Sequence, residues 1–197
     1  MIKAISYLSK NDQKLKFILE NFGEPLVQKR EEGFESMCHI ILEQQVSIAS
    51  AKVCFVKLQT FFGEITPSKI IVATEFELKN CGLSRQKIVY LKDLASKMHN
   101  QQIDFASFKT KTEAQIRAEL ITIKGIGNWS VDVYLMFCMQ HNDVFPLGDI
   151  AIKNTMTELY LTQTTEQMKT ISDTWKPYRS YACFTIWHYY LKKRSKI

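Results

Sequence analysis

The sequence predicts an all-α protein, and three observations lead to that prediction. Its 197 residues include only 7 glycines and 4 prolines, fewer than a chain of many short strands needs for its turns. Apolar residues recur three and four positions apart in several segments, which is the spacing of one helix face. Ser, Thr and Asp residues stand just before these segments, where they can cap a first helical turn. The composition, 46% apolar and 23% charged, is that of an ordinary globular chain and excludes a disordered or collagen-like protein.

In the first half of the chain we expect short helices separated by tight turns. Asn11 and Asp12 can cap a helix that runs to Glu20. The next expected helices are 33–45, 47–63 with a Ser47 cap and Gly63 as its end, 66–73, 74–82, and one that starts at Ser84. After Ser47 the apolar positions step by three and four residues, so their side chains are expected to face the core. These positions are Ile48, Ala51, Phe55, Leu58 and Phe62.

The second half continues in the same way. Capping boxes are expected where a Thr is followed three residues later by Gln or Glu, because each side chain can bind the other's backbone N–H. The helices expected here are 112–121, 130–139, 149–160, one that Thr164 starts and one that Pro177 starts. No long linker or low-complexity segment divides the chain, so about ten short helices are expected to form a single unit over residues 1–197.

Positive charge is clustered in two segments of a chain whose net charge is +6. The segment 84–124 holds eight basic and four acidic residues, and the segment 174–197 holds six basic residues and no acidic one. Clustered positive charge favours a polyanionic partner such as a nucleic acid. The alternative for the second segment is that basic residues near its end complement the C-terminal dipole of a helix. Its basic residues are Lys176, Arg179, Lys192, Lys193, Arg194 and Lys196.

The cysteines show no spacing typical of a metal site or an iron–sulfur cluster. They are Cys38, Cys54, Cys81, Cys138 and Cys183. Most stand among apolar residues, so we expect small buried side chains in a reducing compartment and no metal ligands. The first ten residues lack the apolar core of a signal peptide, and no apolar run reaches membrane length. The sequence therefore predicts a cytoplasmic protein.

The segment Gly125-Ile126-Gly127 lies between two expected helices. Glycines leave the backbone N–H groups open to close approach, and the next helix begins at once, so its unpaired N–H groups point to the same place. Such a turn can bind a phosphate, and Lys124 can add a positive charge. The alternative is an ordinary helix end with a buried isoleucine. Trp129, an aromatic residue in the first turn of the next helix, favours the phosphate site.

Asp149 opens a helix after an irregular segment, a position typical of an N-cap. A carboxylate held there can also serve a displacement at a sugar, where it stabilises a developing oxocarbenium ion and orients or deprotonates the attacking water. The two interpretations are compatible.

Taken in order, five groups of residues resemble one family. They are Gln44-Gln45-Val46-Ser47; Gly82-Leu83-Ser84 with Lys87 and Tyr90-Leu91; 123–130 around the two glycines; Asp143-Val144-Phe145-Pro146 with Gly148-Asp149; and 175–182 with Trp187. This series resembles the helix-hairpin-helix DNA glycosylases, and within them the DNA-3-methyladenine glycosylase II branch. The resemblance covers about residues 30–190. It implies two helical lobes with a cleft between them, a hairpin at about 116–139, and N- and C-terminal helices that share one lobe.

The resemblance also implies roles for single residues. Asp149 matches the catalytic aspartate, and Trp129 and Trp187 match aromatic positions that line the base pocket. Lys124 and the segment Gly125-Ile126-Gly127 match the hairpin that binds backbone phosphate through main-chain N–H groups, often with a bound monovalent cation and with no other cofactor. Gln45 matches the residue that wedges into the duplex where a base is flipped out.

The implied activity is that of a monofunctional DNA glycosylase, which hydrolyses the N-glycosidic bond of alkylated purines of the 3-methyladenine and 7-methylguanine type in base excision repair. Such purines are cationic, so indole faces can attract them. Lyase activity is not expected, because Trp129 stands where lyases carry the lysine that attacks the sugar. The expected partner of this monomer is double-stranded DNA with alkylated bases. The alternatives are a glycosylase for another lesion and a non-catalytic module that binds damaged DNA.

Overall fold

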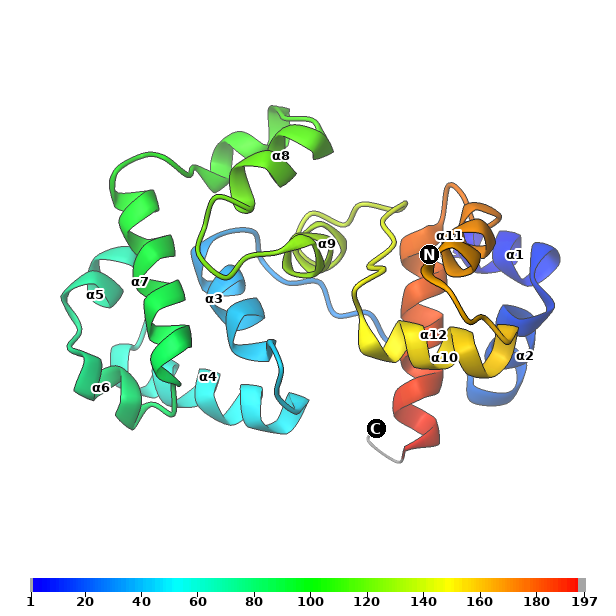
Figure 1. Cartoon of the computed structure of the whole chain (residues 1–197), viewed down its shortest axis with the longest axis horizontal. Helices are drawn as coiled ribbons and strands as arrows, with labels where there is room; N and C mark the ends of the chain where they lie inside the picture. The colour runs from blue at the N-terminus through cyan, green and yellow to red at the C-terminus, as the bar shows by residue number, and fades with distance from the viewer. Residues whose placement is uncertain (1, 195–197) are drawn as a thin grey trace. The chain divides into compact units, whose positions relative to one another are not determined.

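The computed structural model describes residues 2–194, and the regular structure in that range is entirely helical, as Figure 1 shows. The prediction of an all-α protein is thus confirmed. The helices are α1 (Ile2–Asn11), α2 (Gln13–Phe22), α3 (Phe34–Glu43), α4 (Ile48–Phe62), α5 (Pro67–Val72), α6 (Glu75–Asn80), α7 (Arg85–His99), the 3₁₀ helix η1 (Phe105–Thr110), α8 (Glu113–Leu120), α9 (Asn128–Phe137), α10 (Ile150–Tyr160), α11 (Thr165–Asp173) and α12 (Arg179–Lys193). Lys196 of the basic C-terminal segment lies outside the described residues. No helix in the described range is long and apolar enough to cross a membrane.

The chain divides into two compact units. The first comprises Met1–Lys29 together with Leu135–Ile197, and the second comprises Arg30–Tyr134. The N-terminal helices α1 and α2 therefore belong to the same unit as α10, α11 and α12. Helix α9 begins in the second unit and ends in the first, and it follows α8 through the turn at 121–127.

Helix α3 forms the centre of the second unit, where it packs against α4 and α7 (Figure 1). Its inward positions Met37, Ile40 and Ile41 are fully buried, since apolar residues occupy most of its length. Lys87 of α7 donates a 2.6 Å hydrogen bond to the Leu42 carbonyl at the end of α3. Burial lowers the pKa of Lys87, because it penalises the charged ammonium group.

Helix α12 is the most buried helix of the first unit and packs against α1, α2 and α10. Asp12 joins the N-terminal helices to this core: it caps α2 and accepts hydrogen bonds from the Tyr160 hydroxyl at 2.9 Å and from the Trp175 indole N–H at 2.7 Å. Trp175 is fully buried. Burial and the neighbouring Asp12 carboxylate raise the pKa of Tyr160, so this hydroxyl stays protonated and donates.

The helix starts confirm the local sequence signals. Both halves of the capping box are formed at Thr74 with Glu77, at Thr112 with Gln115 and at Thr164 with Gln167. The side chains of the other predicted caps accept main-chain N–H bonds at their helices; they are Asp12, Ser47, Thr66, Ser84 and Asp149.

Four helical segments differ from the sequence prediction. Helix α1 and the 3₁₀ helix η1 were not predicted. Helix α9 begins at Asn128 rather than at residue 130, because the turn at 121–127 leads directly into it and the Val131 N–H already bonds to the Gly127 carbonyl. The last helix begins at Arg179 rather than at Pro177, because the preceding residues form separate turns, among them the bond from Tyr178 N–H to the Trp175 carbonyl.

The predicted inner face of α4 is only partly right. Ala51 and Leu58 are buried, but Ile48 is 63% exposed, since the first turn of α4 extends beyond the core of its unit. Of the cysteines, Cys54 is half-buried and the other four are buried, as expected for small core side chains.

Candidate active site

Asp149 is held at the N-terminus of α10 by main-chain hydrogen bonds. Its backbone is extended, and its Oδ1 accepts N–H bonds from Ala151 at 2.9 Å and from Ile152 at 3.0 Å. These donors and the positive end of the helix dipole stabilise a negative charge at this point. The residue is 9% exposed, so its carboxylate is largely shielded from bulk water.

Trp187 of α12 supplies a third donor to the same oxygen. Its indole Nε1–H donates to Asp149 Oδ1 at 2.9 Å, and its ring stacks on Phe137 with centroids 5.6 Å apart. Phe184 packs against both rings, at 5.1 Å from Phe137 and 6.0 Å from Trp187. The resemblance implied a place for Trp187 in the base pocket, whereas its bond to Asp149 was not predicted. The two residues are 38 positions apart in the sequence, so no local sequence pattern predicts the bond.

The segment before Asp149 is fixed by the start of α12. Arg179 forms two bonds with the Asp143 carboxylate, Nε to Oδ1 at 2.7 Å and Nη2 to Oδ2 at 3.0 Å. The Ser180 hydroxyl donates to the His141 carbonyl at 2.6 Å and accepts from Val144 N–H at 3.0 Å. These bonds attach the irregular segment to a buried helix, which limits the movement of the carboxylate that follows it.

The hairpin turn in the second unit depends on Gly125. This residue has φ +77°, in the left-handed region, and a Cβ added there would lie 2.1 Å from the Tyr90 ring. Both conditions favour glycine, since L side chains are disfavoured at this φ and the ring leaves no space. Ile126 between the two glycines is 6% exposed and anchors the turn in the core.

The turn presents main-chain N–H groups at the surface. Gly125, Gly127 and Asn128 are exposed, and their N–H groups form no hydrogen bond within residues 2–194. Gly127 has open space where a Cβ would stand. Lys124 is exposed as well, with its Nζ 3.8 Å from Asp93, whose Oδ2 accepts the Lys124 N–H at 2.9 Å. Exposed N–H groups at a helix start are groups to which an anion can bind.

An ion pair that the sequence analysis did not identify braces this hairpin. Arg117 of α8 binds Asp132 of α9 at 2.7 Å, Glu113 at 3.0 Å and the Asn128 side-chain oxygen at 3.3 Å. Burial raises the pKa of Asp132 to about 6, although Arg117 acts in the opposite direction. The spacing of Glu113 and Arg117, four residues apart on one helix, is the signal that could have found part of this network. Trp129, in the same first turn of α9, is half-buried.

The loop before α4 contacts the hairpin through Gln44. Its side-chain Nε2 donates to the Gly125 carbonyl at 2.9 Å and to Ser130 Oγ at 3.0 Å. Gln45 is exposed and has φ +56°. In the second unit the structure thus joins Gln44, the residue before Gln45, to the hairpin turn, and in the first unit it brings Asp149 and Trp187 together.

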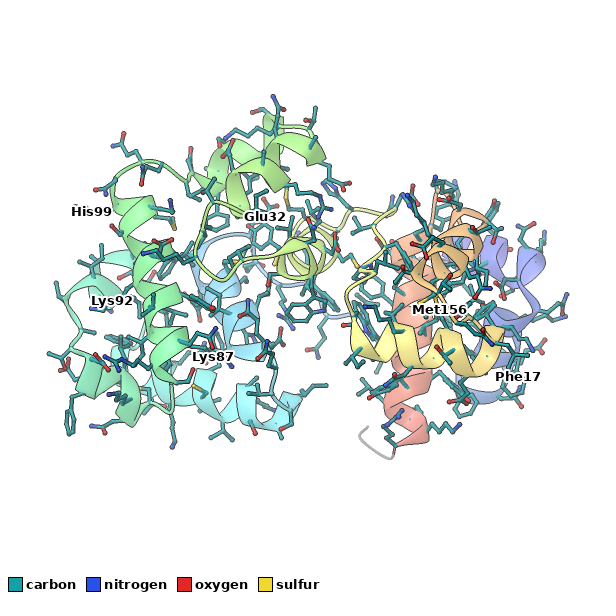
Figure 2. All side chains as sticks on the ribbon, viewed as in Figure 1. Phe17, Glu32, Lys87, Lys92, His99 and Met156 are labelled. Atoms are coloured by element: carbon teal, nitrogen blue, oxygen red, sulfur yellow. The ribbon has the colours of Figure 1, made fainter. Side chains whose placement is uncertain are left out.

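Several lysines of the basic segment 84–124 bind the protein itself. Lys87 and Lys92 project from α7 in Figure 2, and both donate to carbonyl groups at helix ends: Lys87 to Leu42, Lys92 to Ile71 and Ala73. Lys111 pairs with Glu119 at 2.6 Å. Fewer lysines of this segment are therefore available to bind a polyanion than the count of basic residues indicates.

Comparisons with known proteins point to one family. A family model described as HhH-GPD superfamily base excision DNA repair protein matches residues 38–180. In Schizosaccharomyces pombe, the "Alkylbase DNA glycosidase-like protein mag2" is 26% identical over 195 residues, covering 94% of this chain and 92% of that protein. The "DNA-3-methyladenine glycosylase 1" of the same organism is 27% identical over 195 residues, covering 93% and 83%.

A solved structure has the same fold. The Schizosaccharomyces pombe 3-methyladenine DNA glycosylase (Mag1) in complex with abasic-DNA aligns with a TM-score of 0.86 and 25% identity, over 98% of this chain and 97% of that one. The predicted helix-hairpin-helix glycosylase fold is thereby confirmed.

Proposed function

Since the chain belongs to the HhH-GPD superfamily of base excision DNA repair proteins, we propose that it is a DNA glycosylase that hydrolyses the N-glycosidic bond of alkylated purines, of the 3-methyladenine and 7-methylguanine type. The observation that carries this proposal is the Asp149 carboxylate, whose Oδ1 accepts three N–H bonds at a helix start. The names of the relatives, an alkylbase glycosidase-like protein and a 3-methyladenine glycosylase, support this substrate class.

Asp149 is the proposed catalytic residue. As the bond between base and sugar breaks, positive charge develops on the sugar, and a fixed carboxylate stabilises it. The same group orients the water that attacks the sugar carbon and accepts its proton. A purine alkylated at a ring nitrogen already carries a positive charge and leaves as a neutral base, so the protein needs no strong general acid.

The hairpin is the proposed anchor for the DNA backbone. The exposed N–H groups at Gly125 and Gly127 and the ammonium group of Lys124 suit a phosphate. Gln45 is proposed to enter the duplex where the damaged nucleotide is flipped out. Trp129 and Trp187 are proposed to bind the base, since indole faces attract cationic rings.

We further propose that base release occurs without strand cleavage. A lyase needs an amine that attacks the sugar to form a Schiff base, and by the resemblance of the hairpin motif Trp129 occupies the position where lyases carry that lysine. The protein is proposed to act as a monomer on double-stranded DNA.

No organic cofactor is proposed. A monovalent cation at the hairpin would be held by main-chain carbonyl groups of the turn at 121–127. When bound, such an ion would add positive charge near a DNA phosphate.

The test compares the protein with its Asp149→Asn variant on methylated duplex DNA and measures free base and strand breaks separately. Asparagine still caps a helix, so the variant keeps the fold while losing the negative charge. We expect free methylated purine from the unmodified protein only, and no breaks before alkali treatment. Release by both proteins would contradict the role of Asp149, breaks would contradict the absence of lyase activity, and release by neither would leave a DNA-binding module.

A further inference from the structure

Gln44 connects the loop between α3 and α4, which contains the proposed wedge Gln45, to the hairpin through side-chain hydrogen bonds. It ends α3, with φ −62° and ψ 126°, and it directly precedes Gln45. Its side chain bonds to Gly125 and Ser130, which follow it in the sequence by 81 and 86 positions. One amide group therefore connects the end of α3, the hairpin turn and the first turn of α9.

The donor capacity of this amide is fully used. An amide NH₂ carries two protons, and here one is donated to the Gly125 carbonyl at 2.9 Å and the other to Ser130 Oγ at 3.0 Å. The Tyr90 ring of α7 lies against Gly125, where a Cβ would stand 2.1 Å from it. Gly125 thus contacts both Gln44, through its carbonyl, and the Tyr90 ring.

The next residue, Gln45, has a backbone conformation that needs such support. Its φ of +56° lies in the left-handed region, which costs free energy for any side chain with a Cβ and persists only when neighbours enforce it. The Gln45 side chain is exposed and forms no hydrogen bond or ion pair within residues 2–194. Gln45 directly follows the cap of α3, where a left-handed residue commonly ends a helix. The residue before it is fixed by the Gln44 clamp, the name used here for the two Gln44 side-chain bonds to Gly125 and Ser130.

We propose that Gln44 is a positioning residue: its two bonds hold Gln45 in a fixed register against the phosphate-binding turn, so that the wedge enters the duplex at a set distance from the anchored phosphate. This inference rests on the proposed function, since it takes Gln45 as the wedge. Gln44 acts through Gln45 and the hairpin and does not touch the reacting atoms.

The experiment uses a duplex in which 2-aminopurine stands beside an abasic-site analogue, so that its fluorescence rises when the neighbouring stack opens. The variants are Gln44→Met, which keeps the side-chain length and removes both donors, Gln45→Ala, and the two together. Gln102→Met is the matched control, because Gln102 is exposed and its side chain forms no hydrogen bond within the described range. Melting temperature is measured for all four, and Ser130→Ala serves as a second variant that removes one bond of the clamp.

We expect Gln44→Met to lower the equilibrium constant for stack opening by roughly tenfold, the size of one or two lost hydrogen bonds. Gln45→Ala, which removes the wedge side chain itself, should lower it by roughly the same factor. The stack-opening equilibrium constant of the double variant should equal that of the more impaired single variant to within about twofold, because Gln44 acts through Gln45. Gln102→Met should match the unmodified protein, and Ser130→Ala should give an intermediate loss.

The positioning role would be overturned if the fold-loss of stack opening in the double variant equalled the product of the two single losses. It would also be overturned if Gln44→Met opened the stack as well as the unmodified protein. The same samples are assayed for base release from methylated DNA. Coupled fluorescence losses in a protein that releases no base would overturn the proposed function and support the role of Gln44. Absence of stack opening in the unmodified protein would overturn that role, even where base release occurs.

Discussion

Trp187 Nε1 donates a 2.9 Å hydrogen bond to Asp149 Oδ1, the oxygen that also accepts two main-chain N–H bonds at the start of α10. The bond fixes the carboxylate from α12, while the main chain fixes it from α10. One oxygen therefore bears three donors, and the orientation of the whole carboxyl group is determined by two helices.

We expect Trp187→Phe to lower the rate of base release more than it lowers stability. Phenylalanine keeps the packing with Phe137 and Phe184 but removes the donor, and a hydrogen bond to a charged group contributes about 1.5–3 kcal/mol, roughly a 10- to 100-fold change in rate. Single-turnover release of methylated purine measures the effect. The matched control is Trp175→Phe, which removes an indole bond to Asp12. It should lower the melting temperature and leave the rate per folded molecule within about twofold, and equal rate losses in the two variants would argue against the special role of Trp187.

Substitutions at the two hairpin glycines should separate folding from binding. Gly125→Ala meets both a left-handed φ and the Tyr90 ring, so we expect it to lower the free energy of unfolding by at least about 2 kcal/mol. Gly127→Ala meets open space and should change stability by less than about 0.5 kcal/mol, while its Cβ obstructs a phosphate. Urea unfolding and binding to an abasic-analogue duplex measure the two effects. Equal stability of the two variants would contradict the steric account of Gly125.

Lysines of the same basic segment should differ in their effect on DNA binding. Lys124 is exposed beside the turn, so Lys124→Ala should reduce the slope of log affinity against log salt by about 1, with little change in stability. Lys87 binds the Leu42 carbonyl, so Lys87→Met should lower stability by about 1 kcal/mol and leave the slope unchanged. Fluorescence anisotropy over a range of salt concentrations measures the slope. A reduced slope in Lys87→Met would show that its ammonium group reaches the DNA.

Asp132 should make one contribution to stability that decreases as pH rises. Its pKa is about 6 in the folded protein against 3.8 in the reference state, so between these values the folded protein binds more protons than the unfolded chain. Stability from this group is therefore largest below pH 4 and lost as pH rises through 6, by roughly 2–3 kcal/mol. Carboxylates with lowered pKa values, such as Glu158 beside Lys193 and Tyr189, act in the opposite sense.

Comparison with Asp132→Asn isolates that contribution. The free energy of unfolding is measured in urea at pH 4.5 and at pH 7 for both proteins. On going from the lower to the higher pH, the unmodified protein should lose stability relative to the variant. A constant difference between the two proteins would show that Asp132 does not titrate in this range.

The sequence predicted the features that depend on neighbouring residues. Thr112 and Gln115 lie within one turn of each other, so their reciprocal bonds can be read from spacing alone. The cap at Asp149 was predicted for the same reason. Helix α1 was missed because it begins at Ile2, without the Ser, Thr or Asp that marks the other starts.

Features that depend on distant residues were not predicted. The bond from Trp187 to Asp149 and the bonds from Gln44 to the hairpin join residues far apart in the chain, and no periodicity encodes them. The engagement of Lys87 with a helix end shows the same limit, because net charge does not reveal which ammonium groups are already paired.

The C-terminal end of α10 is bonded to the N-terminal part of the chain. Tyr160 closes that helix and donates to Asp12, the residue that also receives the Trp175 indole and begins α2. Asp12, between the first two helices, thus supports the C-terminal end of α10, the helix whose N-terminal end carries Asp149. Trimming the chain before residue 13 would remove Asp12 and both of these bonds, so the shortened protein should be less stable in the unit that carries α10.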